Sequence, residues 1–405
     1  MSDQPMTAPT KSLGRACPIC GDGRGVVLHT FAFTIPDGIR LPTCYDLVCC
    51  LCCGFTFADT AADQAAYDQF YAEQSKYENK EISSGGSTSS WDKQRFCEVA
   101  DFLRRLLPTV DIPILDIGCA NGGLLLALRD RGFTSLQGLD PSAKCVENVR
   151  AAGLTAEQGG IFESGEESDR FGCVVISHVL EHLRDLRCGV SRVADRVASG
   201  GYLYVEVPDA SRYHEYYKVP YYYFDCEHIN HFESAALVNL LSGEGFEPRE
   251  LVQKEISTSA DDSRYPVISA LFRKTGRSEG RAISRCCGAR NSIEAYLKLS
   301  ANDLVADLIQ RLVDGGREIV IWGAGQYASR LLSNTSLSRC RIRFFVDRDA
   351  KKQGGHLGSV PVLAPSALAG HVGPVVVCAA LHSAEIKAEI RGMGLQNEIV
   401  VLAGE

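Results

Sequence analysis

Short apolar runs alternate with stretches of helical spacing over most of the chain. From residue 112 onward these runs are PILDIGC, SLQGLD, CVVISH and GYLYVEV, and each except the last leads into an amphipathic segment. This alternation is typical of a parallel sheet with crossover helices. A later run, VISALFRK, predicts an added antiparallel strand that closes the region. A helix is expected over 91–107, ahead of the first strand. The pattern therefore predicts an α/β core within residues 71–275.

A second series of apolar runs follows, and it predicts another α/β domain over residues 315–405. The runs are REIVIWGAGQ, IRFFVDRD, GPVVVCAA and NEIVVLAG. Between the two series, residues 276–288 are rich in Arg, Gly and Ser and read as a linker. Residues 291–313 then carry apolar positions near helical spacing, which predicts one connecting helix. Residues 276–314 are accordingly assigned as linker and connecting helix.

The first 70 residues differ in character from the rest. Residues 1–14 carry Pro, Ser, Thr and Lys without periodicity, and we expect a disordered tail. Residues 15–70 are cysteine-rich with short strand-like pieces and end in an Ala-rich helical stretch. They predict a small separate module in front of the α/β core.

Composition and charge narrow the class of protein. The chain has 405 residues, 45% of them hydrophobic, and no apolar run reaches the roughly 20 residues that cross a bilayer. No leader is evident at Met1, so we expect a cytoplasmic protein without a membrane partner. A formal net charge of -8 argues against nucleic acid as the main partner. The sequence does not indicate the oligomeric state.

Seventeen cysteines in a long chain without a signal peptide are expected to be mostly reduced thiols. The crowded ones near the start form two C-x-x-C knuckles, Cys17 with Cys20 and Cys50 with Cys53. Two such knuckles supply the four thiolates of a structural Zn²⁺ site. Cys49 with Cys52 is an alternative second pair, but Gly54 follows Cys53 and favours the first choice. Buried free thiols are the other interpretation.

A glycine-rich turn follows the strand PIL and opens a helix. It reads Asp116-Ile117-Gly118-Cys119-Ala120-Asn121-Gly122-Gly123, and Asp140 closes the next strand. Glycines let a ligand approach the backbone, and a carboxylate at that position can accept both hydroxyls of a ribose. The spacing differs from the G-x-G-x-x-G of nicotinamide enzymes, which remain an alternative.

This turn and acid resemble the first two motifs of class I S-adenosylmethionine-dependent methyltransferases, which have a Rossmann-like fold. The resemblance implies that Gly118, Ala120 and Gly122 line the cofactor, that Asp116 helps to position it and that Asp140 holds its ribose. Gly160, Ile161 and Phe162 would border the adenine.

Histidines after the fourth and fifth strands are candidates for chemistry. His178 and His182 are four residues apart and would share a helix face, as metal ligands or as one base with a structural partner. No third metal ligand is evident from the sequence. An aromatic-rich loop leads to Glu227, His228 and His231, where the rings would form either an apolar substrate wall or a packed lid.

The order of these motifs is similar to that of zinc-containing sugar C-methyltransferases, over nearly the whole chain beyond the tail. It comprises the knuckles, Tyr71 and Tyr77 before a serine-rich loop, D-I-G-C-A-N-G-G, V-L-E-H, a Glu-His pair after V-E-V-P, and a final W-G-A-G domain. Members methylate a carbon next to the keto group of a nucleotide-linked deoxysugar through an enolate.

The resemblance implies a role for each matching residue. His228 would be the base with Glu227 beside it, while His182 and Tyr77 would orient the substrate or stabilise the enolate. His178 falls at the cofactor-binding edge. The last domain would help to enclose the nucleotide-linked sugar. The family's Tyr-His-Glu-His reads Asp225-Cys226-Glu227-His228 here, so one tyrosine hydroxyl is missing.

Two other functions compete with this one. O- or N-methylation of another small molecule or saccharide would use the same cofactor loop, with the base deprotonating a hydroxyl. A non-catalytic protein that binds S-adenosylmethionine or a nucleotide-linked sugar is the third interpretation. A second nucleotide cofactor at the W-G-A-G loop is a further alternative, since a lone G-x-G is weak support.

Overall fold

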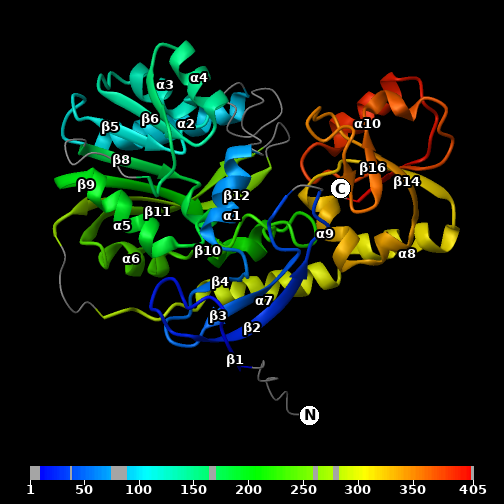
Figure 1. The fold of residues 1–405 in the computed structure, drawn as a ribbon, viewed down its shortest axis with the longest axis horizontal. Coiled ribbons are helices and arrows are strands. Elements are labelled where there is room, and N and C mark those ends of the chain that lie inside the picture. Colours follow the sequence, from blue (N-terminus) through cyan, green and yellow to red (C-terminus); the bar gives the residue numbers. More distant parts are fainter. Residues whose placement is uncertain are drawn as a thin grey trace.

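The computed structural model describes residues 10–36, 39–73, 89–163, 170–258, 263–276 and 282–402. Within them the chain forms three sheets (Figure 1). Figure 1 shows the seven-stranded sheet and its helices on the left, the six-stranded sheet on the right, and the five-stranded sheet below and between them.

The seven-stranded sheet is the expected α/β core. Its order is β11-β12-β9-β8-β5-β6-β7, with β5 to β9 parallel and β12 antiparallel to both neighbours. The strands are β5 (Ile114–Ile117), β6 (Leu136–Asp140), β7 (Thr155–Gln158), β8 (Phe171–Ser177), β9 (Val197–Pro208), β11 (Phe246–Ser257) and β12 (Arg264–Lys274). The antiparallel strand predicted from VISALFRK is therefore confirmed.

Helices cover both faces of this sheet because its strands are apolar on both faces. Alternate residues of β8 illustrate this: Cys173 and Val175 join one core cluster, whereas Val174 and Ile176 join another. The first cluster contains α2 and α3, and the second contains α5 and α6. The helices are α2 (Ser90–Leu106), α3 (Gly123–Asp130), α4 (Ala143–Ala151), α5 (Leu186–Arg196) and α6 (Ser234–Ser242). The helix expected over 91–107 is confirmed as α2.

The cysteine-rich segment forms the antiparallel sheet β1-β2-β3-β4-β10. Its strands are β1 (Thr10–Ser12), β2 (Arg24–Ala32), β3 (Cys44–Cys50), β4 (Thr56–Asp59) and β10 (Asn230–His231). Two features differ from expectation. Thr10–Ser12 pairs with β2, so the disordered tail predicted to residue 14 is wrong at these residues. Strand β10 comes from the α/β core, so this module is not separate but shares a sheet with that core.

The C-terminal domain is a second α/β unit. Its sheet has the order β15-β16-β14-β13-β17-β18, formed by β13 (Glu318–Trp322), β14 (Arg341–Val346), β15 (His356–Leu357), β16 (Val360–Leu363), β17 (Val375–Val377) and β18 (Ile399–Val401). Its helices are α9 (Gln326–Asn334) and α10 (Ser383–Gly392). The predicted second series of strands is confirmed.

The connecting segment holds two helices rather than the one predicted over 291–313. They are α7 (Gly288–Ala301) and α8 (Leu304–Gly315). The break has a local cause, because the side chain of Asp303 accepts a hydrogen bond from the Val305 amide at 2.7 Å and caps a new helix. In Figure 1, α7 runs beneath the core and α8 lies under the C-terminal sheet.

Candidate functional site

A cavity of about 1110 Å³ lies between the α/β core and the C-terminal domain. Loops at the carboxyl ends of β5, β6, β7 and β8 line it on one side, and the loops after β13, β14 and β17 line the other. Ligands of open α/β sheets bind at this edge, where the strand order reverses. Helix α1 (Gln64–Glu73) and the segment 222–228 contribute to the walls, as do residues of α2, β11, β12 and α10.

The glycine-rich turn after β5 has a backbone that suits a bound ligand. Gly118 and Gly122 both have φ of 77°, and Ala120 has φ of 46°, which is rare for a residue with a side chain. The Ala120 amide donates to Asp140 Oδ2 at 2.8 Å, and the Ser142 amide donates to Oδ1 at 2.9 Å. Asp140 thus ties the turn to the next strand. Asp116, Gly118, Ala120 and Asp140 line the cavity, whereas Gly122 is the N-cap of α3 and is not among the lining residues.

Asp116 and Arg95 set the electrostatics at the bottom of this turn. Burial, and then the negative charge of Asp140, raise the pKa of Asp116 to about 8, while the Arg95 guanidinium on α2 opposes this shift. Both residues line the cavity. Arg95 could not be identified as a site residue from the sequence, because it belongs to no motif. It comes near Asp116 only through the packing of α2.

Gly160, Ile161 and Phe162, predicted to border adenine, also line the cavity after β7. The aromatic-rich loop was expected to form either a substrate wall or a packed lid, and its tyrosines pack in or against one core cluster. Tyr213 and Tyr223 stack with ring centroids 3.8 Å apart and are buried, whereas Tyr222 and Tyr265 reach the cavity.

His178 is held by buried carboxylates. Its Nδ1 lies 3.1 Å from Glu181 Oε1, and its Nε2 lies 3.5 Å from Glu206 Oε1. Burial disfavours the imidazolium, but the bonds to Glu181 and Glu206 outweigh burial and raise the pKa of His178. His178 also has a positive φ of 55° and lines the cavity. Strained residues of this kind collect at functional sites.

The two acids beside His178 stay ionised. Burial alone would raise the pKa of Glu181, but His178, followed by His182 and His228, lowers it to about 2. Lys254 Nζ lies 3.1 Å from Glu206 Oε2, and Tyr204 and Ser269 donate to the same oxygen. Neither acid received a role from the sequence: Glu206 on β9 meets His178 only through folding, and the spacing of Glu181 three residues after His178 does not by itself show that the two side chains meet.

His182 and His228 face each other across the cavity wall, with ring centroids 4.7 Å apart. The Nδ1 of His182 lies 2.7 Å from the Tyr71 hydroxyl and 3.2 Å from the Glu227 carbonyl oxygen. Tyr71 on α1 therefore contacts the histidine that the resemblance assigns to orientation. Tyr77 lies outside the described residues.

Glu227 precedes His228 in the sequence but does not itself line the cavity. It accepts a hydrogen bond at 3.0 Å from Gln326 Nε2 of the C-terminal domain. Glu181 fills the position beside the two histidines instead, and the ligand atoms of Glu181, His182 and His228 lie within 4.8 Å of one another. The His178 and His182 pair suggested by the sequence does not form this group.

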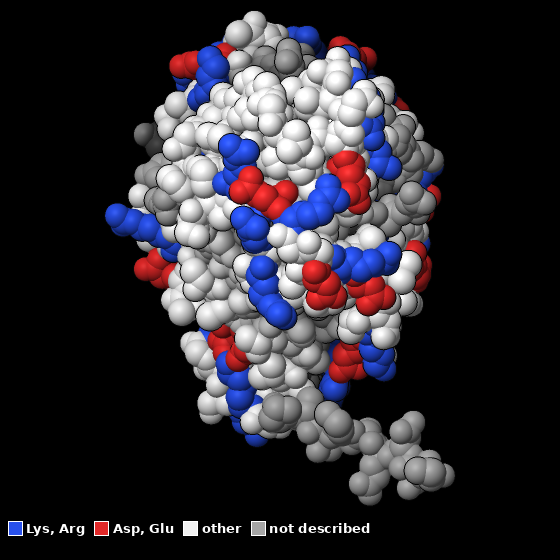
Figure 2. Space-filling view, turned by 90° about the vertical axis from the view of Figure 1, so that its right-hand side faces the viewer, with Lys and Arg blue, Asp and Glu red and all other residues white. Residues whose placement is uncertain are grey.

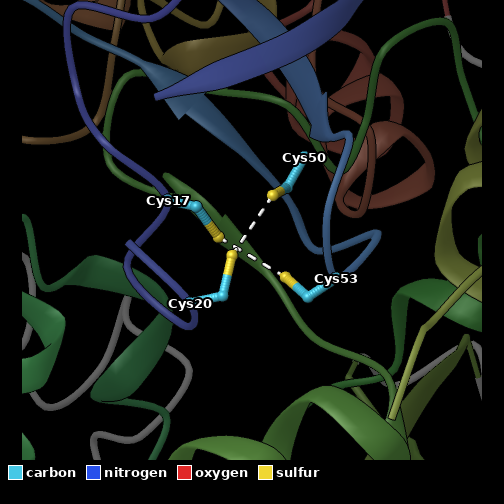
Figure 3. Close-up of side chains that lie close together, drawn as sticks. All are labelled: Cys17, Cys20, Cys50 and Cys53. Carbon is cyan, nitrogen blue, oxygen red and sulfur yellow. Dashed lines mark hydrogen bonds between the residues drawn. The ribbon is translucent and has the colours of Figure 1, made fainter. Parts of the chain in front are cut away.

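The four cysteines chosen from the sequence come together in the N-terminal sheet (Figure 3). Cys17 Sγ lies 3.5 Å from Cys53 Sγ, and Cys20 Sγ lies 3.4 Å from Cys50 Sγ. All four ligand atoms lie within 4.8 Å of one another. The alternative pair is not part of this group: Cys49 Sγ donates to the Gly54 carbonyl at 3.4 Å, and Cys52 is exposed.

The turn after β13 repeats the geometry of the turn after β5. The Ala324 amide donates to Asp347 Oδ2 at 2.9 Å, and the Asp349 amide donates to Oδ1 at 2.9 Å. Gly323 has φ of 107°, and a Cβ there would lie 2.6 Å from the Cys378 carbonyl oxygen. Trp322, Gly323, Gly325 and Gln326 line the cavity opposite the first turn.

Charges of both signs are interspersed on the face of the C-terminal domain (Figure 2). Ion pairs of this domain include Arg317 with Glu398 at 2.7 Å and Arg343 with Glu318 at 3.6 Å. No helix in the described part of the chain is long and apolar enough to cross a membrane.

Comparison with known proteins gives one family and several relatives. Residues 91–251 match the methyltransferase domain family. The chain is 22% identical over 305 residues to the C-methyltransferase NovU of Streptomyces niveus, covering 68% of this chain and 70% of that protein. It is 31% identical over 104 residues to a ubiquinone biosynthesis O-methyltransferase of Rhizobium johnstonii, covering 24% of this chain and 42% of that protein.

Among solved structures, a putative S-adenosylmethionine-dependent methyltransferase from Listeria monocytogenes has 16% sequence identity and a TM-score of 0.36. The match covers 43% of this chain and 96% of that one.

Proposed function

We propose that this chain, a class I S-adenosylmethionine-dependent methyltransferase, methylates a carbon next to the keto group of a nucleotide-linked deoxysugar. Its class rests on the domain match over residues 91–251 and on the sheet order. The observation that carries the finer proposal is the pair His182 and His228 in a cavity shared with a second α/β domain. The similarity to a C-methyltransferase at 22% identity supports it.

The residues present fit S-adenosylmethionine. The positive φ of Gly118 and Ala120 makes a tight turn whose residues line the cavity, and acids lie beside it at Asp116 and Asp140. Those four residues, with Gly122 behind the turn and Phe162 at its far side, would hold the cofactor. When bound, S-adenosylmethionine supplies the electrophilic methyl group that the substrate carbon accepts.

His228 is the proposed base. It lies at the cavity wall and would take the proton from the carbon next to the substrate keto group, leaving the electron pair as an enolate. His182 is oriented through Nδ1 by Tyr71 and the Glu227 carbonyl, and its ring lies beside that of His228 at the cavity wall. It would position the substrate or stabilise the enolate oxygen.

The N-terminal cysteine group is proposed as a structural Zn²⁺ site. Sulfur separations of 3.4 and 3.5 Å are near the roughly 3.8 Å that a tetrahedron of Zn–S bonds requires. Four thiolates leave no open position, so the ion would stabilise the module and take no part in transfer.

O-methylation is the second candidate, favoured by the identity of 31% to a ubiquinone biosynthesis O-methyltransferase over 104 residues. In that case the same base would deprotonate a hydroxyl.

The assignment of His228 is tested by His228→Asn, with exposed His356→Asn as the matched control. Loss of the base should lower turnover about a hundredfold to ten-thousandfold, whereas S-adenosylmethionine should bind with unchanged affinity. Turnover is followed by mass spectrometry and binding by calorimetry. Wild-type turnover in His228→Asn would exclude it as the base.

A further inference from the structure

The segment that carries His228 is held from the C-terminal domain. Asp225 Oδ1 accepts hydrogen bonds from the amides of Glu227 at 2.9 Å and His228 at 2.7 Å, which makes a tight local turn. This turn fixes the backbone of His228 but not its direction relative to the cavity. That direction depends on what the turn packs against.

Helix α9 contacts the turn at both ends. Gln326 Nε2 donates to Glu227 Oε1 at 3.0 Å and lies 3.4 Å from Cys226 Sγ. Arg330, one helical turn later, donates from Nη1 to the Phe224 carbonyl at 3.1 Å and lies 3.9 Å from Asp225 Oδ2. Glu227 is 5% exposed and Arg330 is 3% exposed. Bonds to buried charged groups are stronger than bonds at the surface.

Gln326 lies where the turn after β13 meets helix α9. It is the first residue of α9 and the last of the Trp322–Gln326 turn, and it lines the cavity. The turn itself is fixed by Asp347 through the Ala324 amide. A group bound along this turn would therefore lie beside the residue that holds Glu227.

We infer that Gln326 is a positioning residue for His228, acting through the carboxylate of Glu227. The inference rests on the proposed function, in which His228 is the base. It assigns Glu227 to the support of the base across the domain boundary, not to contact with the reacting atoms. A base must be held within a fraction of an ångström of its productive place, and a displacement of about 1 Å costs roughly a hundredfold.

A double-mutant cycle tests this inference with Gln326→Ala, Glu227→Ala and the pair. Gln310→Ala on α8 is the matched control, because its side chain bonds Asp314 on an exposed surface. Gln326→Ala should lower kcat about ten- to a hundredfold and slow hydrogen exchange at the substrate carbon equally, with KM and cofactor affinity changed less than threefold. In the Glu227→Ala background the same substitution should have almost no effect. Independent, multiplying effects would overturn the inference.

A second assay needs no substrate. Diethyl pyrocarbonate modifies accessible histidines, and mass spectrometry of peptides gives the modification rate of each one. The rate at His228 is compared with that at exposed His356. Gln326→Ala should raise the rate at His228 at least threefold and leave His356 unchanged. An unchanged His228 rate would overturn the positioning role even if no substrate is turned over. The two proposals can fail separately. If only the proposed function is wrong, His228→Asn stays active while Gln326→Ala still changes the rate at which His228 is modified.

Discussion

At the scale of single residues, His231 illustrates how its surroundings can hold a histidine neutral. It lies in β10, 0% exposed, with Tyr213 and Phe224 against its ring. Burial, and then the charge of His228, lower the pKa of His231 to about 3. The ring therefore stays uncharged at neutral pH and contributes to the core of the N-terminal sheet.

This residue predicts a pH dependence of stability. Below about pH 6.5 the unfolded chain binds a proton at His231 that the folded chain does not bind, so stability falls as the pH falls from 6.5 toward 3. Relative to His231→Phe, wild type should lose about 2 kcal/mol of unfolding free energy between pH 7 and pH 5. Denaturant unfolding at several pH values measures it. If the unfolding free energies of the two proteins changed equally with pH, His231 would not be a buried, neutral histidine in the folded protein.

Residues adjacent in the sequence were easier to predict than residues that meet through folding. The knuckle cysteines and the turn after β5 follow short motifs, and the structure brings Cys17, Cys20, Cys50 and Cys53 together as predicted. The site also contains residues that are far from these motifs in the sequence and reach it only through folding. They are Arg95 on α2, Glu206 on β9 and Gln326 on α9.

At the scale of elements, the two equivalent turns offer a matched comparison. In each, an alanine amide donates to the acid at the end of the next strand, Ala120 to Asp140 and Ala324 to Asp347. The proposal places S-adenosylmethionine only at the first turn. Asp140→Asn should weaken S-adenosylmethionine binding at least about tenfold, because a charged acceptor for the ribose hydroxyls is lost.

Asp347→Asn perturbs the same backbone geometry and should change that affinity less than threefold. Calorimetry on both variants gives the answer. Equal losses would mean that the turns share one ligand or that the substitutions act through folding.

The glycines that follow the two knuckles also form a matched pair. Gly21 has φ of 80° with open space around it, whereas a Cβ on Gly54, at φ of 82°, would lie 1.8 Å from the Cys286 carbonyl oxygen. Gly21→Ala should cost roughly 1–2 kcal/mol for the left-handed backbone alone. Gly54→Ala should cost at least about 3 kcal/mol, because the backbone of 286 must also move. Thermal unfolding of both variants tests this, and equal costs would contradict the packing described.

Helices and strands could be predicted from the sequence where a buried strand or an amphipathic helix was long enough to give a clear apolar pattern. The strands of both α/β units are of this kind. The break between α7 and α8 was missed because it depends on one cap, Asp303, inside a continuous amphipathic pattern. Strand β10 was missed because two residues carry no periodic signal.

At the scale of the whole molecule, the N-terminal sheet joins the two α/β units. It shares β10 with the core, and it meets α9 through Asn334, whose Nδ2 donates to the Ala32 carbonyl at 2.7 Å. Thr34 and Ser333 hydroxyls lie 2.8 Å apart at the same contact. Under the proposal, a metal held by the cysteine group would therefore stabilise a sheet that contacts both α/β units.

The proposed function depends on one step, in which an enolate forms in this cavity and its carbon is methylated. The most direct measurement is mass spectrometry of the purified protein with S-adenosylmethionine and a panel of nucleotide-linked 4-keto-deoxysugars in deuterated water. The expected product is heavier by one methyl group, and solvent deuterium should be incorporated next to the ketone of recovered substrate. A methylated product without any such exchange, and with the methyl group on oxygen or nitrogen, would contradict it.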